Sequence, residues 1–384
     1  MERTRWGVVL ALWFAGLCAA GQFAKVGVIF AELAPLWPEA GARLGLVVSV
    51  VGLVGIVFGT TAGMLVARLG ARRMMIGALL AGAVLSAVQV AILPLGWMIA
   101  SRVAEGFAHL AIVVAGPVLI GAVTLPRDQA ATMTLWSTFF GVAFTLTAAF
   151  GLPFAQSHGP GALFAAHAGL MACAALLLAL VLPQDGPPQG ARLSLRGILR
   201  DHGRIYASPR IAAPAMGFVF YTLMFVAMLT LVPGLVAHEH RALTAALMPL
   251  VSIGASLLLG VVMVRWIGAV AVVQAGFGLT IFAALVWWAA SGVALVLAAM
   301  ALSMALGLVQ GASFAAIPAL NASREDRAMA AGAIAQLGNL GTTLGTPVLL
   351  AMSGAWGPAS LAWFTLPLAL AGIGVHQWQR ARRG

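Results

Sequence analysis

Apolar segments of about 20 residues recur along the whole chain, and each is long enough to cross a bilayer as an α-helix. Barrel strands would alternate polar and apolar residues, which these segments do not. Because a backbone in lipid must satisfy its own hydrogen bonds, the sequence predicts an all-α polytopic membrane protein. We expect twelve spans, at residues 7–30, 44–66, 74–94, 97–123, 130–154, 161–182, 211–236, 243–264, 268–290, 293–318, 328–352 and 359–378.

The distribution of arginine predicts the orientation of these spans. If both termini lie on one side, all arginines outside the spans except Arg43 and Arg241 share that side. Basic residues concentrate in cytoplasmic loops, so we expect both termini in the cytoplasm of a multi-pass protein. The net charge of +11 is therefore a topological signal and does not indicate binding to nucleic acid. The first span is too long for a cleaved signal peptide.

The longest polar segment separates six spans from six. It runs from Pro183 to Arg210, and its arginine-rich part, Leu193 to Tyr206, predicts an amphipathic helix on the membrane surface. We therefore expect an N-terminal bundle at residues 1–182, a linker at 183–210 and a C-terminal bundle at 211–384.

The two halves repeat weakly at an offset near 200 residues. Glu105-Gly106 corresponds to Gln310-Gly311, Pro117 to Pro318, and Asp128 to Asp326. A duplicated six-helix unit in one chain is typical of carriers that work by alternating access.

The loop after the second span carries a motif. The stretch Gly63-Met-Leu-Val-Ala67-Arg68-Leu-Gly70-Ala71-Arg72-Arg73 resembles the Gly-x-x-x-Asp-Arg-x-Gly-Arg-Arg/Lys loop of the major facilitator superfamily, bacterial type. It lacks the family's aspartate, which Ala67 replaces. The resemblance covers nearly the whole chain and implies two pseudo-symmetric six-helix bundles. It also implies a cytoplasmic gate, for which we expect Gly63, Arg68, Gly70, Arg72, Asp128 and Asp326; alternatively, the arginines only set topology.

A second motif lies in the fourth span. Arg102-Val-Ala-Glu105-Gly106 resembles the Arg-x-x-Gln-Gly motif of proton-coupled exporters, with glutamate in place of glutamine. The Gly-Pro signature of antiporters is absent from the fifth span, so the direction of transport stays open.

Few ionisable residues lie deep within spans. Lys25, the only lysine of the chain, lies in the first span, and Arg102, Glu105 and His109 share one face of the fourth. An ionised side chain in hydrocarbon is costly, about 2.5–3.5 kcal/mol on insertion scales, so these residues indicate a functional site. The resemblance places the first, fourth, seventh and tenth spans around a central cavity. Lys25 would then face the fourth span, with Gln22 one turn away.

The cluster predicts a site for an anion. Lys25 and Arg102 exceed Glu105 by one charge, and Arg102 can bind a carboxylate or phosphate through two parallel hydrogen bonds. We expect Glu105 to carry the coupling proton, with His109 as a substrate ligand or second carrier. The alternative is a buried structural network, with the histidines, including His167, serving in packing.

The second half offers neutral polar groups for the same site. We expect Tyr221, Gln310, Gln336 and Asn339 to orient a substrate by hydrogen bonds. Equally, these groups could bond neighbouring helices.

The sequence thus predicts a secondary transporter, proton-coupled, for a small organic anion or zwitterion. The alternatives are a proton-driven exporter of amphiphilic, drug-like compounds and a non-transporting scaffold or receptor. No metal-ligand cluster, nucleophile–base pair or phosphate-binding Gly-Lys-Ser/Thr loop appears, so we expect neither an enzyme nor a cofactor. We expect a monomer in a bacterial inner membrane, with the lipid bilayer and a small-molecule substrate as its partners.

Overall fold

The computed structural model describes residues 3–59, 61–62, 66, 69–128, 132–133, 135–136, 138–185 and 195–383. The chain divides into two compact units. Unit 1 comprises residues 1–38 and 61–193, and unit 2 comprises residues 39–60 and 194–384. The segment 39–60, which belongs to the N-terminal half by sequence, thus packs with the second half.

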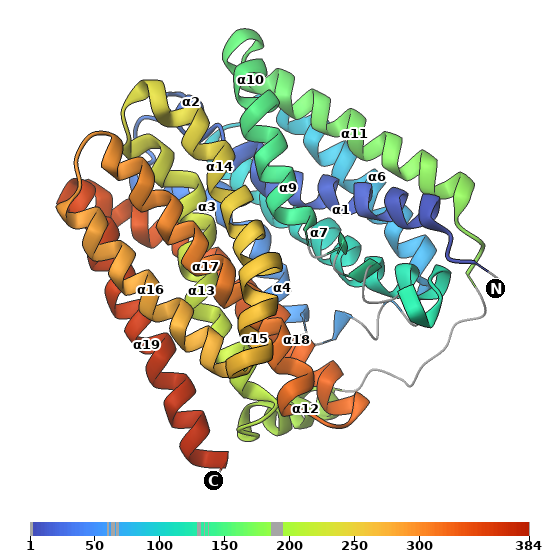
Figure 1. Ribbon diagram of the computed structural model, residues 1–384. Coiled ribbons are helices and arrows are strands. Elements are labelled where there is room, and N and C mark those ends of the chain that lie inside the picture. Colours follow the sequence, from blue (N-terminus) through green and yellow to red (C-terminus); the bar gives the residue numbers. More distant parts are fainter. Residues whose placement is uncertain are drawn as a thin grey trace. The chain divides into compact units, whose positions relative to one another are not determined.

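The described part of unit 1 is helical (Figure 1), and five of its segments are long and apolar enough to cross a membrane. Within it, α1 packs against α7, α9 and α11, and α6 packs against α7 and α11. Its elements are α1 (Trp6–Gly27), α2 (Phe30–Leu33), α6 (Ala71–Gln89), α7 (Leu95–Val123), α9 (Phe139–Leu146), the π-helical turn η5 (Thr147–Gly151), α10 (Leu152–His158) and α11 (Pro160–Val181).

Unit 2 begins with an irregular helical segment and continues with seven further helical segments. The first comprises η2 (Gly41–Arg43), α3 (Leu44–Ser49), η3 (Val50–Gly52) and α4 (Leu53–Phe58). Those that follow are α12 (Leu195–Ala207), α13 (Ala212–Leu231) with η6 (Val232–Leu235), α14 (Arg241–Gly254) with η8 (Ala255–Gly260) and α15 (Val261–Ile267), α16 (Ala269–Ala289), α17 (Val293–Leu320), α18 (Arg324–Trp356) and α19 (Ser360–Arg383).

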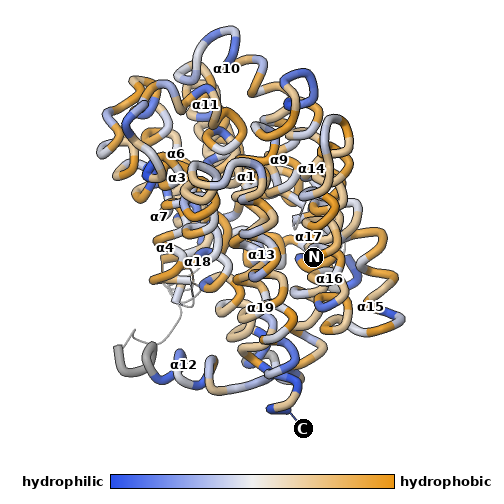
Figure 2. The backbone as a smooth tube through the Cα atoms, turned by 90° about the vertical axis from the view of Figure 1, so that its left-hand side faces the viewer, coloured by the Kyte–Doolittle hydropathy of each residue, from blue (hydrophilic) through white to orange (hydrophobic). Residues whose placement is uncertain are grey.

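Within the described residues, the predicted spans are largely helical. In the described part of the chain, eleven segments are long and apolar enough to cross a membrane. The last of them, Asp326–Arg383, is 58 residues long and contains both α18 and α19, which are separated at Gly357, where φ is +56°. Figure 2 shows apolar residues along these helices and hydrophilic residues gathered at α12 and the C-terminus. The chain is a multi-pass, all-helical membrane protein.

Glycines allow α18 to approach its neighbours closely. A Cβ atom on Gly55 would lie 2.2 Å from Nδ2 of Asn339, and one on Gly345 would lie 2.0 Å from the carbonyl oxygen of Leu223 in α13. Small residues let backbones meet at such distances, and α18 is held between α13 and the segment 41–58 in this way.

The amphipathic helix predicted in the linker is present as α12. Beyond its first residues, Ile205 is buried and Tyr206 donates a hydrogen bond of 2.8 Å to Oε1 of Gln336 in α18. Arg204 pairs with Asp326 at 3.1 Å. The helix is therefore attached to the end of α18 within unit 2.

Candidate functional site

Three ionisable side chains meet inside unit 1. Lys25 of α1 donates to Oε1 of Glu105 at 2.6 Å, and Arg102 donates from Nη1 to Oε2 of the same carboxylate. The side chains of Arg102 and Glu105 are inaccessible to solvent, and only 2% of the Lys25 side chain is exposed. The expectation that Lys25 faces the fourth span is confirmed. We call these three residues the ion cluster.

Two residues of α6 complete the coordination of the cluster. Ser86 and Gln89 lie three residues apart and so share one face of α6. The Lys25 ammonium donates to Oγ of Ser86 at 2.6 Å and to Oε1 of Gln89 at 2.8 Å. Glu105 accepts further bonds from Ser86 at 3.2 Å and from Gln89 at 3.0 Å. Lys25, Arg102 and Gln89 thus donate to the Glu105 carboxylate, an arrangement that suits its ionised, acceptor-only form. The single hydroxyl hydrogen of Ser86 can serve either Glu105 or Nδ1 of His167.

The sequence prediction missed Ser86 and Gln89, although a signal was available. The family resemblance places the first, fourth, seventh and tenth spans around the cavity, and these residues lie in the third. Two polar residues three apart in an otherwise apolar span were the available signal.

Two histidines hold α1 at consecutive carbonyl groups. His167 of α11 contacts the Cys18 carbonyl through Nε2 at 2.9 Å, and His109 of α7 contacts the Ala19 carbonyl through Nδ1 at 3.1 Å. A carbonyl oxygen only accepts, so His167 carries a hydrogen on Nε2 and His109 carries one on Nδ1. Nδ1 of His167 lies 2.8 Å from Oγ of Ser86, which connects this histidine to the ion cluster.

Gln22 lies one turn of α1 from Lys25 and is fully buried. Neither polar atom of its amide has a hydrogen-bond partner among the described residues. Its Nε2 would lie 3.0 Å from a Cβ on Gly82, so the side chain points toward α6. A buried, unpartnered amide costs free energy, about 1–3 kcal/mol, unless another group satisfies it.

The charge of this site follows from its members. Two cations and one carboxylate give the ion cluster a formal charge of +1 in an apolar interior. Breaking either pair would leave an uncompensated buried charge, which costs about 3–5 kcal/mol. Removal of the carboxylate without another anion in its place would therefore be costly. The described residues include no group of three or more His, Cys, Asp or Glu side chains placed to hold a metal ion.

The four predicted residues of the second half all lie in unit 2. Tyr221 of α13 is 2% exposed, and its hydroxyl has no partner among the described residues. Gln310 of α17 is half-buried. Asn339 donates to the carbonyl of Ala335, one turn earlier in α18, at 2.7 Å.

Gln336 connects three segments of unit 2. It donates to the Ile56 carbonyl at 2.8 Å, accepts from Tyr206, and lies 3.1 Å from Nε2 of His202. These bonds attach α12 and the segment 41–58 to α18. Of the four residues, Tyr221 is the one whose polar atom is buried and still unengaged.

The predicted gate residues Gly63 and Arg68 lie outside the described residues, whereas Gly70 and Arg72 are described. Gly70 has φ of +88°, a conformation that glycine adopts without strain, and it precedes α6. The Arg72 guanidinium donates to the carbonyls of Ala179 at 2.8 Å and Leu182 at 3.2 Å, at the end of α11.

Asp185, which the sequence prediction did not select, caps the start of α6. Its carboxylate accepts from the backbone N–H groups of Arg72 and Arg73, both at 2.9 Å. A carboxylate at a helix N-terminus satisfies unpaired donors and complements the helix dipole. Arg72 and Asp185 thus hold the adjoining ends of α6 and α11 together. The only sequence signal was a lone aspartate just after a span.

The two other predicted gate residues have partners of their own. Asp128 accepts from the Thr4 hydroxyl at 2.5 Å, next to the start of α1. Asp326 accepts from Ser323 at 2.8 Å and pairs with Arg204. In the described contacts Arg72 bonds to backbone carbonyls, and neither aspartate serves as its partner.

Comparison with solved structures identifies the fold. A bacterial homologue of the human lysosomal transporter Spinster, in its inward-facing and unoccupied conformation, superposes with a TM-score of 0.71 and 14% identity. That match covers 99% of this chain and 96% of the other. The human organic anion transporter MFSD10 (TETRAN) superposes with a TM-score of 0.70 and 17% identity, over 96% and 99% of the two chains.

A comparison with curated proteins gave no significant match. The family model of the Major Facilitator Superfamily matches residues 12–346, which is most of the chain. Together with the helical architecture, this match establishes that the chain belongs to the Major Facilitator Superfamily and is a secondary transporter, not an enzyme.

Proposed function

We propose that the protein carries a small organic anion, or a zwitterion with an exposed carboxylate or phosphate, by alternating access coupled to protons. The observation that carries this proposal is the buried ion cluster, whose two cations share a single carboxylate. Arg102 and Lys25 are the groups that would bind the substrate's negative charge. Glu105 is the group that would take the proton.

Competition for the two cations supplies the coupling. A substrate carboxylate that engages Lys25 and Arg102 takes the place of Glu105 and releases it from its strongest donors. Protonation then neutralises the released Glu105. The formal charge of the cluster is +1 before the exchange and +1 after a monoanion and a proton have entered together. Each additional buried charge is costly. The carrier therefore favours binding the substrate anion and the proton together over binding either of them alone.

Unpartnered polar groups within each unit support a substrate role. Gln22 in unit 1 and Tyr221 in unit 2 each bury polar atoms that lack partners among the described residues. A substrate that offers hydrogen-bonding groups would remove that cost. The name of the human transporter that shares this fold refers to organic anions, in agreement with the proposal, but at 17% identity this likeness extends only to the fold.

Two thermal-shift screens and one transport assay test the proposal. Purified protein is screened against monocarboxylates, dicarboxylates, phosphate esters and drug-like amines, since a ligand of the native state raises the melting temperature. Each hit is repeated with Lys25→Ala. We expect carboxylates or phosphate esters to stabilise the wild type and to lose this effect in the variant. If only amines stabilise it, the runner-up function, export of amphiphilic compounds, replaces this one.

The coupling is tested in proteoliposomes with the best hit. An inward proton gradient should drive accumulation of the hit in the wild type. With Glu105→Gln, accumulation should vanish while exchange of labelled for unlabelled hit survives, since the amide stands for the protonated acid. Gradient-driven accumulation by Glu105→Gln would exclude Glu105 as the proton carrier and make His109 the next candidate.

The finer topology is part of the same proposal. The arginine bias supports cytoplasmic termini, with the His238–Arg241 segment on the other side of the membrane. The functional division into bundles at 1–182 and 211–384, with 183–210 as the linker, and the monomeric state are likewise proposed from the sequence.

A further inference from the structure

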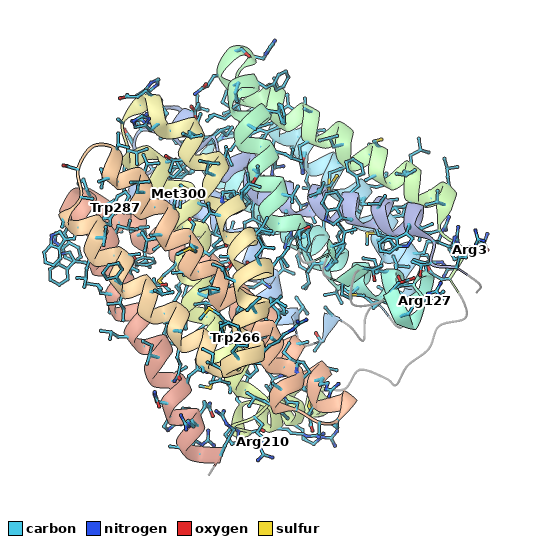
Figure 3. The ribbon with its side chains drawn as sticks, in the orientation of Figure 1. Arg3, Arg127, Arg210, Trp266, Trp287 and Met300 are labelled. Atoms are coloured by element: carbon cyan, nitrogen blue, oxygen red, sulfur yellow. The ribbon has the colours of Figure 1, made fainter. Side chains whose placement is uncertain are left out.

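Four arginines of unit 2 gather where its C-terminal helix ends. They are Arg210, two residues before α13, and Arg380, Arg382 and Arg383, in the last turn of α19. Arg382 donates to the carbonyl of Ala207 at 2.9 Å, and Arg383 donates to the carbonyl of Pro209 at 3.0 Å. These two bonds attach the end of α19 to the loop between α12 and α13, beside Arg210 (Figure 3). We call these four residues the arginine patch.

Among the residues that the structure describes, no carboxylate offsets the positive charge of the arginine patch. Arg383 lies close enough to Arg210 and Arg380 for their charges to interact unfavourably. The Asp326 carboxylate of the same unit pairs with Arg204, which is not a member of the patch. The dipole of α19 contributes only about half a negative charge at its end. A guanidinium has five donors, and in the described contacts Arg382 and Arg383 each use one for the loop carbonyls.

An exposed apolar stripe leads along α19 to this patch. Trp363, Leu370 and Trp378 are spaced by seven and eight residues, which places them on one side of the helix, and each is at least 50% exposed. The Arg382 guanidinium stacks over the ring of Trp378 at 4.8 Å. On a helix of membrane length such a stripe faces acyl chains, and a tryptophan beside arginines is typical of the depth of lipid headgroups.

We propose that the arginine patch binds the phosphate of an anionic phospholipid, whose acyl chain lies along the stripe of Trp363, Leu370 and Trp378. Arginine binds phosphate oxygens through paired hydrogen bonds, and the four uncompensated charges favour a headgroup with net negative charge. The bound lipid would neutralise the repulsion at this corner and stabilise the junction of α12, α13 and α19. This site is separate from the ion cluster and does not depend on what the transporter carries.

Native mass spectrometry of the full-length protein in detergent tests this site. The protein is titrated with dioleoylphosphatidylglycerol, with dioleoylphosphatidylcholine as the zwitterionic lipid and with glycerol phosphate as a headgroup without chains. Each arginine near an anionic headgroup contributes about fivefold in affinity. Arg380→Gln/Arg383→Gln should therefore weaken binding of phosphatidylglycerol by about 25-fold. The control Arg43→Gln/Arg265→Gln removes two exposed charges from the same unit and should leave binding within twofold.

Each outcome decides for or against the proposal. Arg380→Lys/Arg383→Lys keeps the charge and should lose only part of the affinity, because an ammonium cannot form the paired bonds. Equal binding of the two lipids by the wild type overturns the site without any variant. Unchanged binding of phosphatidylglycerol by Arg380→Gln/Arg383→Gln also overturns the site. An equal loss of affinity in the control Arg43→Gln/Arg265→Gln does the same. If glycerol phosphate binds as tightly as the lipid, the patch is a site for free anions and the lipid is excluded.

Discussion

Replacing Glu105 by glutamine should destabilise unit 1 strongly, although the change is nearly isosteric. At 2.6 Å and an effective dielectric constant of about 20, the attraction between Lys25 and Glu105 is about 6 kcal/mol. Desolvation offsets part of it, and removal of one partner from a buried pair costs about 3–5 kcal/mol. The new amide also replaces one acceptor oxygen by an N–H₂ group, which then faces other donors. In one orientation of the amide these donors are Lys25 and Ser86. In the other they are Arg102 and Gln89.

A double variant separates the charge from the loss of packing. Glu105→Gln alone raises the formal charge of the ion cluster from +1 to +2, and adding Lys25→Met returns it to +1. The double variant should therefore be more stable than Glu105→Gln, with a coupling energy of about 0.5–3 kcal/mol between the two sites, the range for residues in contact. Thermal unfolding in detergent measures the stability of the single and of the double variant. A loss of about 3 kcal/mol corresponds to roughly 6–12 °C for a domain of 150–250 residues.

The exposed Glu239 supplies the control, because Glu239→Gln makes the same chemical change outside the cluster. We expect its melting temperature to stay within about 1 °C of the wild type, as for a surface substitution. The reasoning fails if Glu105→Gln has the same melting temperature as the wild type. It also fails if the losses from Lys25→Met and Glu105→Gln simply add, since the two charges would then not depend on one another.

Three further predictions concern binding, packing and topology. Lys25→Ala should abolish binding of an anionic ligand and Lys25→Arg should restore it in part, which thermal shifts will show; normal binding by Lys25→Ala would make the lysine structural. Gly345→Ala should destabilise by about 1–3 kcal/mol, because the new Cβ would lie 2.0 Å from the Leu223 carbonyl, whereas Gly354→Ala on the same helix has open space and should be neutral in thermal unfolding. A cysteine at His240 should react with an impermeant thiol reagent from outside intact cells, and labelling only after permeabilisation would reverse the proposed orientation.

Composition and pattern determined the architecture. The spans were predictable because a helix that crosses lipid must be apolar for about 20 residues, and this constraint acts on each segment separately. The break between α18 and α19, at Gly357, could be predicted for the same reason. Lys25 and Glu105 stood out because ionisable residues are rare in spans.

Tertiary structure decided which groups surround that pair. Ser86, Gln89 and His167 are ordinary polar residues in sequence, and they join the ion cluster because α6 and α11 pack against α1 and α7. Asp185 likewise caps α6 from more than 100 residues away, where the sequence suggested Asp128 or Asp326 as partners for the arginines. The physical reason is that hydropathy is a property of one segment. Hydrogen-bond partners depend on how two packed segments are rotated about their axes and on the depth of each. A span can turn about its axis without changing its apolar length, and only packing against its neighbours sets which of its polar residues face one another.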